Sequence, residues 1–248
     1  MKWGTRYGPQ YVNRLFCMVQ RHMAGVVGKD YRFICITDDT SQVSEGVECF
    51  PIPELNVSLP FHMQNTPWLK LLVWDNPLFD LDGDALFLDL DVVITGRLDD
   101  FFAYQPGKFC VIHNWTEPRK KTGNTSVFRF PVGKFPEILN MFKEDMQGTF
   151  LRHRIEQRYI SAYLEPKGEQ VFWPKSWCRS FKEELLPNWP MRFFKPAELP
   201  LDARIVVFHG KPDPDEAAKG VWPLGKGDGW KRIYKSIKPS TWIDEHWH

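Results

Sequence analysis

The chain lacks the features that mark membrane, secreted or nucleic-acid-binding proteins. No apolar run approaches the roughly 18–20 residues that cross a bilayer, and we expect no signal peptide. The formal net charge is only +1 over 248 residues, so bulk attraction to nucleic acid or anionic lipid is not indicated. These absences predict a cytoplasmic protein without a nucleic-acid partner; peripheral contact with the inner membrane face is the alternative.

Cysteine is scarce and scattered. The five cysteines form no C-x-x-C pair, and Cys17, Cys35 and Cys110 lie in apolar runs. This distribution predicts buried free thiols rather than a disulfide framework or a zinc site. Internal repeats, low-complexity segments and linkers are also lacking, so we expect residues 1–248 to form one mixed α/β domain with a substantial core.

Alternation of helical and strand patterns predicts the fold. Residues 8–27 have apolar positions at helical spacing, and the compact strand 31–36 then stops at Asp38 and Asp39. A helix followed by a short buried strand with polar residues at its end is typical of a Rossmann-like sheet. Further helices are expected at 67–74, 135–146 and 154–164, and further strands at 47–52, 86–94, 108–114, 125–130, 171–173 and 204–208.

The stretch 86–94, Leu-Phe-Leu-Asp-Leu-Asp-Val-Val-Ile, carries the strongest chemical signal. Asp89 and Asp91 flank Leu90 in an apolar run, and in one continuous strand their side chains would share a face. Two neighbouring buried carboxylates are costly unless a cation neutralises them or the strand ends at a cleft. The stretch alone leaves two alternatives open: a divalent cation, or carboxylates that cap a turn.

A second polar strand end completes a possible site. The apolar run 204–208 leads directly into His209, Gly210 and Lys211. Ligands bind beyond the carboxyl ends of strands in open α/β sheets, so we expect this group to meet the two aspartates. Two carboxylates and an imidazole suit Mn²⁺ or Mg²⁺, and Lys211 with the Gly210 backbone suits a diphosphate.

The order of these motifs resembles that of the GT-A glycosyltransferases, and most closely the family-8 enzymes that use nucleotide sugars. The resemblance rests on the D-x-D strand and the late His-Gly motif, supported by Trp68–Leu72, Asn124–Val127 and the pair Glu156-Gln157. It implies a GT-A fold with a mixed, mostly parallel central sheet flanked by helices. It also implies transfer of a hexose from a nucleotide-diphosphate sugar, expected to be a UDP-sugar, with retention of configuration.

The resemblance implies a role for each matching residue. Asp89, Asp91 and His209 would hold the metal, with Asp89 also at the ribose, while Lys211 would neutralise the diphosphate. Lys70 stands where the family usually has arginine. Glu156 stands where the family has aspartate, and the resemblance implies that Glu156 and Gln157 are the catalytic pair lining the sugar and acceptor side. The remaining residues implied at the donor or acceptor are Trp3, Gly4, Thr5, Tyr7, Asp38, Asp39, Leu90, Asn124, Gln157 and Gly210.

Two other functions fit the same residues. Asp89-Leu90-Asp91-Val92-Val93 also matches the nucleophile motif of haloacid-dehalogenase-like phosphatases, in which Asp89 would attack phosphate. That family needs a later acidic pair at a strand end, where this chain has His209. The third alternative is a non-catalytic nucleotide-binding protein. The acceptor is expected to be a glycan, a lipid or a protein.

Both ends of the chain carry expectations of their own. Met1 stands where the first strand of a GT-A sheet should be ending, so that strand is expected to be short or missing and an upstream start is predicted. Residues 222–248 are aromatic and basic, which predicts packing or a partner surface. Arg119, Lys120 and Lys121 form a basic loop that predicts either a solvated surface or contact with acidic acceptors or lipid headgroups.

Overall fold

The computed structural model describes residues 1–23, 31–55, 58–60, 63–64, 66–225 and 234–248. These residues fall into two compact units, each assembled from separate stretches of the chain. Unit 1 comprises 1–9, 31–88 and 100–173, and unit 2 comprises 10–30, 89–99 and 174–248. The parts of the sequence that carry D-x-D and His-Gly therefore belong to the same unit.

The described residues of unit 1 form two sheets. Strands β1 (Ile34–Thr37) and β2 (Glu48–Pro51) pair in parallel, and Lys2 forms a further parallel bridge to Thr37. The larger sheet has the order β3-β6-β5-β7, in which β6 is antiparallel to both neighbours and β5–β7 is parallel. Its strands are β3 (Asp84–Leu88), β5 (Phe109–His113), β6 (Gly123–Pro131) and β7 (Gln170–Phe172).

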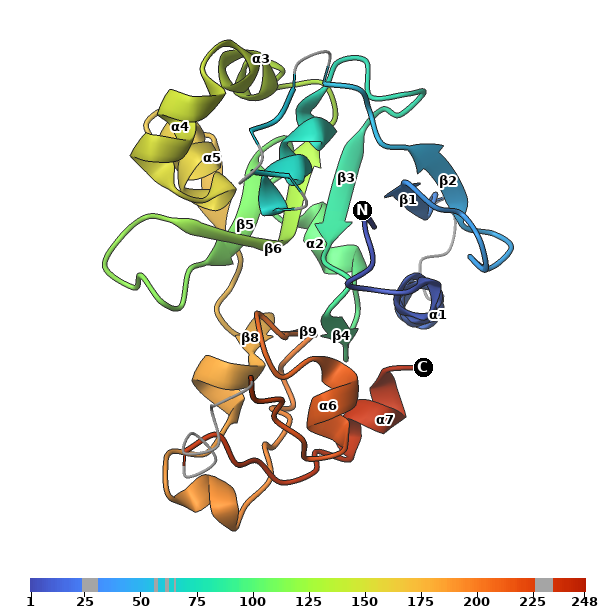
Figure 1. Cartoon of the computed structure of the whole chain (residues 1–248), viewed down its shortest axis with the longest axis vertical. Coiled ribbons are helices and arrows are strands. Elements are labelled where there is room, and N and C mark those ends of the chain that lie inside the picture. Colours follow the sequence, from blue (N-terminus) through green and yellow to red (C-terminus); the bar gives the residue numbers. More distant parts are fainter. Residues whose placement is uncertain (24–30, 56–57, 61–62, 65, 226–233) are drawn as a thin grey trace. The chain divides into compact units, whose positions relative to one another are not determined.

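Helices gather beside the larger sheet of unit 1 (Figure 1). They are the 3₁₀ helix η2 (Pro67–Trp74) and the α-helices α2 (Asp99–Ala103), α3 (Glu137–Glu144), α4 (Met146–His153) and α5 (Glu156–Leu164). Their apolar faces build an aromatic-rich core, in which the ring of Trp68 stacks on Phe142 and the ring of Trp74 packs among Phe109, Phe128 and Phe130. Aromatic pairs of this kind contribute beyond the area that they bury.

Unit 2 is organised around a three-stranded sheet of order β4-β9-β8. Strand β4 (Val92–Ile94) is antiparallel to β9 (Ile205–Val207), and β8 (Cys178–Ser180) is parallel to β9. Its helices are α1 (Pro9–Met23), the π-helical turn η3 (Phe181–Leu185), the 3₁₀ turn η4 (Met191–Phe193), α6 (Pro214–Ala218) and α7 (Trp242–His246).

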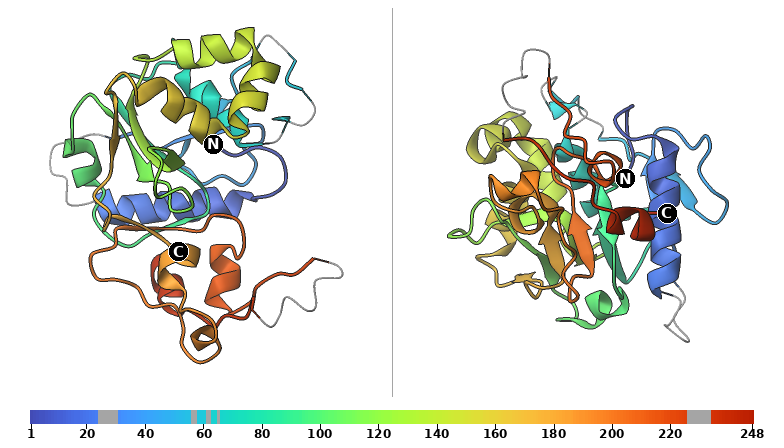
Figure 2. Two further views of the ribbon diagram at one scale, coloured as in Figure 1. Left: turned by 90° about the vertical axis from the view of Figure 1, so that its left-hand side faces the viewer. Right: turned by 90° about the horizontal axis from the view of Figure 1, so that it is seen from below.

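The C-terminal aromatic residues take part in the packing of unit 2. Helix α7 lies beside α1 (Figure 2), where Trp247 makes an edge contact with Tyr11 and receives the guanidinium of Arg14 over its ring. Trp242 donates its indole N–H to the Ala197 carbonyl at 3.0 Å. The described part of this segment thus fits the packing alternative, while Trp230, Lys231 and Arg232 lie outside the described residues.

Most predicted elements are present, with two informative differences. The expected strand 86–94 is two strands, β3 and β4, which belong to different sheets, and three of the six strand pairings among the described residues are antiparallel. Residues 24–27 of the expected first helix lie outside the described residues. Cys35 and Cys110 are buried free thiols as expected, whereas Cys17 is exposed on α1.

No helix in the described part of the chain is both long and apolar enough to cross a membrane.

Candidate functional site

Asp89, Leu90 and Asp91 form the turn between β3 and β4, not the middle of a strand. The prediction that a strand places both carboxylates on one face is therefore wrong. The cause is a change of pairing partner: β3 pairs with β6, whereas β4 pairs with β9, so the chain must leave one sheet between them. Asp91 and Leu90 are buried and Asp89 is partly exposed.

Strand pairing brings the D-x-D turn next to the His-Gly loop. The Val92–Val207 pair continues one residue further, where the Phe208 N–H donates to the Asp91 carbonyl at 3.1 Å. The backbone that carries Asp91 therefore runs beside the segment that leads into His209. The sequence predicted this juxtaposition from the two strand ends, and unit 2 contains it.

The imidazole of His209 is held by Ser180. Its Nε2 is hydrogen-bonded to Ser180 Oγ at 2.7 Å, and the Lys182 ammonium donates to the His209 carbonyl at 3.1 Å. Burial, aided by the charge of Lys182, lowers the pKa of His209 to about 4, so the ring is neutral near pH 7. Neutral imidazole is the form that ligates metals.

Two carboxylates and a neutral imidazole are ligand types that suit a divalent metal. Asp89, Asp91 and His209, which supply them, all belong to unit 2. Within the described residues, however, no three His, Cys, Asp or Glu side chains are gathered so as to hold a metal. The Nε2 atom of His209 is engaged by Ser180. Metal ligation by Asp89, Asp91 and His209 therefore stays a prediction.

Lys211 is bound by two carboxylates. Its Nζ lies 2.6 Å from Asp213 Oδ2 and 2.7 Å from Glu216 Oε1, at the start of α6. Burial lowers the pKa of Lys211, but the hydrogen bonds and the negative charges of Asp213 and Glu216 together outweigh burial, so the pKa is raised. Gly210, which precedes Lys211 in the sequence, has a φ of 86°, a backbone conformation that favours glycine.

In unit 1 the N-terminal loop meets the end of β1. The Gly4 N–H donates to Asp38 Oδ2 at 2.8 Å, and buried Lys2 donates to the Asp39 carbonyl at 3.4 Å. Asp39 accepts hydrogen bonds from the Ser41 side chain and backbone, which lower its pKa. The structure thus joins two predicted nucleoside contacts, while Trp3 and Tyr7 are partly exposed and Thr5 is exposed nearby in sequence.

A buried polar chain links the residues predicted for the sugar side. Lys70 donates to the Thr125 carbonyl at 3.1 Å, and Thr125 Oγ1 donates to Glu156 Oε1 at 2.7 Å. All three are at most 6% exposed. Neighbouring Asn124 and Gln157 are partly exposed, and the Asn124 side chain accepts the Ser126 N–H at 3.1 Å.

Several residues that bond to predicted site residues were not foreseen, among them Lys2, Thr125, Ser180 and Lys182. Lys2 and Thr125 lie in unit 1, and Ser180 and Lys182 lie in unit 2. Thr125 stood inside the Asn124–Val127 motif, which was the available signal for it. Ser180 and Lys182 fall in the stretch 175–200, in which the apolar residues follow no clear helical or strand period.

The fold was compared with known proteins. No family model and no curated protein sequence matches the chain. Among solved structures, the galactosyltransferase LgtC in complex with donor and acceptor sugar analogues is similar, with a TM-score of 0.58, 14% identity and coverage of 96% of both chains. The glycosyltransferase GlyE of Streptococcus pneumoniae TIGR4 has a TM-score of 0.57 and 14% identity; the match covers 98% of this chain and 62% of GlyE.

A third similar structure is the apo form of the bifunctional glycosyltransferase WbbM, with a TM-score of 0.55 and 12% identity. The match covers 83% of this chain and 44% of WbbM. The mixed α/β class and the resemblance to the GT-A glycosyltransferases are confirmed at the level of architecture. The chain therefore has the GT-A fold, similar to that of the family-8 glycosyltransferase LgtC.

Proposed function

We propose that the chain is a metal-dependent glycosyltransferase that moves a hexose from a UDP-sugar to a glycan acceptor, with retention of configuration. The observation that carries the proposal is the pairing of the D-x-D turn with the His-Gly loop inside one unit of a GT-A fold. The glycan acceptor is suggested by LgtC, whose structure contains donor and acceptor sugar analogues.

In this proposal Asp89, Asp91 and His209 hold Mn²⁺ or Mg²⁺. When bound, the metal would neutralise charge on the leaving diphosphate and so lower the cost of breaking the bond to the sugar. Ser180 orients the His209 ring through its 2.7 Å hydrogen bond. The chemistry of this donor set supports the assignment.

The residues of unit 1 are assigned to the nucleoside and sugar. The Gly4–Asp38 contact orders the N-terminal loop against the end of β1, which suits it to contact a base or ribose. Asn124 and Gln157 are partly exposed and so remain available to a sugar. Glu156 is buried and bonded to Thr125, which favours a positioning role and leaves Gln157 as the better candidate for direct contact.

The phosphatase alternative is less well supported. A haloacid-dehalogenase-like site needs a further acidic pair at a strand end. Strand β9 leads to His209, and the nearby carboxylates of Asp213 and Glu216 are engaged by Lys211. Similar solved structures are glycosyltransferases.

Two lysines of the basic loop are engaged by carboxylates. Lys120 pairs with Glu117 at 2.7 Å, and Lys121 pairs with Glu165. Two of its three cations thus pair with carboxylates of the same unit, and one of these carboxylates, Glu117, is shared with Arg158. Contact of this loop with lipid headgroups is correspondingly weakened as a hypothesis.

The proposal is tested by calorimetric titration of UDP with and without Mn²⁺, followed by a panel of nucleotide sugars assayed for hydrolysis. We expect Mn²⁺-dependent binding that Asp91→Asn abolishes. Asp202→Asn is the control, because Asp202 is an exposed carboxylate of the same unit. Its ion pair with Arg179 is long, at 3.9 Å, so its loss should matter little. If Asp91→Asn is folded and binds UDP with unchanged metal dependence, the metal assignment is wrong; stabilisation by fluoroberyllate instead of UDP would favour the phosphatase.

A further inference from the structure

Lys182 projects from the π-helical turn η3 to the loop that follows β9. Strands β8 and β9 are parallel, with Ser180 opposite Val207, so the residues after both strands emerge at the same edge. Lys182 Nζ donates to the His209 carbonyl at 3.1 Å. It also lies 3.6 Å from the point where a Cβ on Gly210 would stand, so the ammonium adjoins the Gly210 backbone.

The turn that carries Lys182 is fixed at its base. Ser180 Oγ accepts the Glu183 N–H at 3.0 Å and is bonded to His209 Nε2 at 2.7 Å. The Glu184 carboxylate accepts the Ser180 N–H at 2.9 Å and pairs with Arg179. Single π-helical turns occur frequently at functional sites. This network ties the backbone around Lys182 directly to His209.

The two lysines at this loop differ in their charge environment. Lys211 Nζ is within 2.7 Å of two carboxylates, those of Asp213 and Glu216, which give that trio a formal charge of −1. For Lys182, the described residues provide no carboxylate at ion-pair distance, and its recorded partner is a backbone carbonyl. An ammonium has three N–H donors, so Lys182 keeps donors beside Gly210 besides the one that it gives to the His209 carbonyl, and no carboxylate of the described residues pairs with its charge.

We propose that Lys182 binds the diphosphate of the nucleotide donor at the His209–Gly210 loop. The inference rests on the proposed function, and it adds to the diphosphate site a cation that the sequence motifs do not contain. Lys211 then acts at that loop only when a ligand draws it from Asp213 and Glu216, whereas no carboxylate of the described residues competes for Lys182. A hydrogen bond to a charged group contributes enough for roughly ten- to one-hundred-fold in affinity.

Calorimetric titration of the full chain with UDP, UMP and inorganic pyrophosphate, each with Mn²⁺, tests this role. Lys182→Met should weaken UDP and pyrophosphate by roughly ten- to one-hundred-fold and UMP by much less, while Lys182→Arg retains most of the affinity. Lys175→Met is the matched control, because Lys175 is an exposed lysine of the same unit. Thermal melts check that each variant is folded, and Lys182→Gln replaces Lys182→Met if that variant is not.

The outcomes separate this inference from the proposed function. If the wild type binds UDP and Lys182→Met behaves like Lys175→Met, Lys182 is not a phosphate ligand and the proposed function stands. Equal weakening of UMP and UDP, without recovery in Lys182→Arg, assigns Lys182 to support of the His209 carbonyl and overturns the inference. If the wild type binds neither UDP nor pyrophosphate with Mn²⁺, both proposals fail.

Discussion

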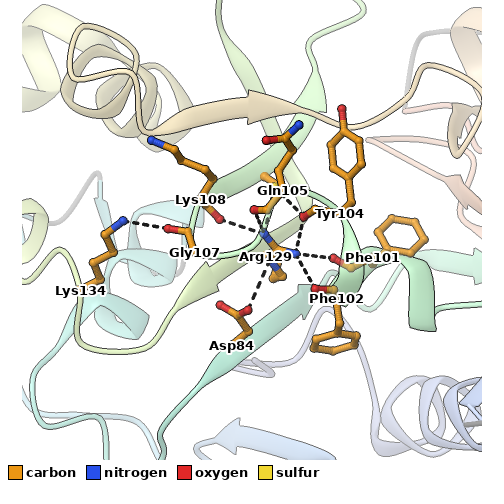
Figure 3. Close-up of polar contacts among 10 residues, drawn as sticks. Asp84, Phe101, Phe102, Tyr104, Gln105, Gly107, Lys108, Arg129 and Lys134 are labelled. Carbon is orange, nitrogen blue, oxygen red and sulfur yellow. Dashed lines mark hydrogen bonds and ion pairs between the residues drawn. The ribbon is translucent and has the colours of Figure 1, made fainter.

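Arg129 is a fully buried cation of unit 1, and its removal tests how the fold satisfies buried carbonyl groups. The side chain is fully buried in β6 and donates through Nη1 to the carbonyls of Phe101, Phe102 and Tyr104 at 2.8, 2.9 and 2.6 Å (Figure 3). Nη2 donates to the carbonyl of Gln105 and, at 3.3 Å, to that of Lys108. One guanidinium thus binds the carbonyls that end α2 and begin the approach to β5.

The substitution Arg129→Met removes all of these donors, and the methionine side chain still fills the space of the aliphatic part of Arg129 in the sheet. Gln105 is exposed, so its carbonyl can be rehydrated, and the Asp84 carboxylate, 4.0 Å from Nε, is already 29% exposed. The main loss of stability comes from the carbonyls of Phe101, Phe102 and Tyr104, which lose the hydrogen bonds from Arg129. At about 1–2 kcal/mol for each of these three carbonyls, we expect a loss of about 3–6 kcal/mol in the free energy of unfolding, a large part of the stability of an ordinary domain.

Urea unfolding followed by circular dichroism measures this loss as a change in the free energy of unfolding. Arg152→Met is the control, because Arg152 is 59% exposed and pairs at 3.0 Å with the exposed Asp145; it should cost less than about 1 kcal/mol. Arg129→Lys should fall between them, since a single ammonium cannot reach carbonyls in several directions. If Arg129→Met costs no more than Arg152→Met, the carbonyls find other partners and the reasoning is refuted.

Local patterns were sufficient for most elements. The spacing of apolar residues after Pro9 predicted α1, and compact apolar runs predicted β1, β5 and β9. Strand ends marked by polar residues also located the D-x-D turn and the His-Gly loop. These features depend on neighbours a few residues apart, which is the range over which periodicity carries information.

The division of 86–94 into β3 and β4 could not be predicted in the same way. Leu-Phe-Leu-Asp-Leu-Asp-Val-Val-Ile is one apolar run, and nothing within it shows that its first half pairs with β6 and its second half with β9. Pairing is set by residues more than thirty positions away. The two aspartates, interpreted as charges within a strand, are the polar residues at which the chain changes sheets.

Short elements account for the missed residues of the site. Strand β8 has three residues and η3 five, too few for a period, and proline and tryptophan surround them. The contact between Lys182 and His209 exists because β8 lies parallel to β9. Likewise, the Thr125–Glu156 hydrogen bond joins residues 31 positions apart in the sequence. The sequence therefore shows that position 156 has glutamate where the family has aspartate, but it does not show that this carboxylate binds Thr125.

Two further predictions concern unit 1. Hydrogen bonds from Arg158 and then Lys120 lower the pKa of Glu117 from 4.5 to about 2, so its stabilising effect is complete above about pH 4.5 and is lost as the pH falls toward 2. Glu117→Gln should therefore lose less stability than the wild type between pH 7 and 3 in urea unfolding; an equal loss would exclude this carboxylate as a source of acid sensitivity. Thr125→Val keeps the shape of the side chain but removes the hydroxyl that donates to the buried Glu156 carboxylate at 2.7 Å. Leaving that charged oxygen without its donor should cost about 2–3 kcal/mol of unfolding free energy, whereas Thr125→Ser, which retains the hydroxyl, should cost clearly less. Because the bond is charge-assisted, Glu156→Gln should reduce the difference between the valine and serine variants. If the two variants of Thr125 are equally stable in both backgrounds, the hydroxyl does not hold Glu156, and direct contact of Glu156 with the sugar becomes the better hypothesis.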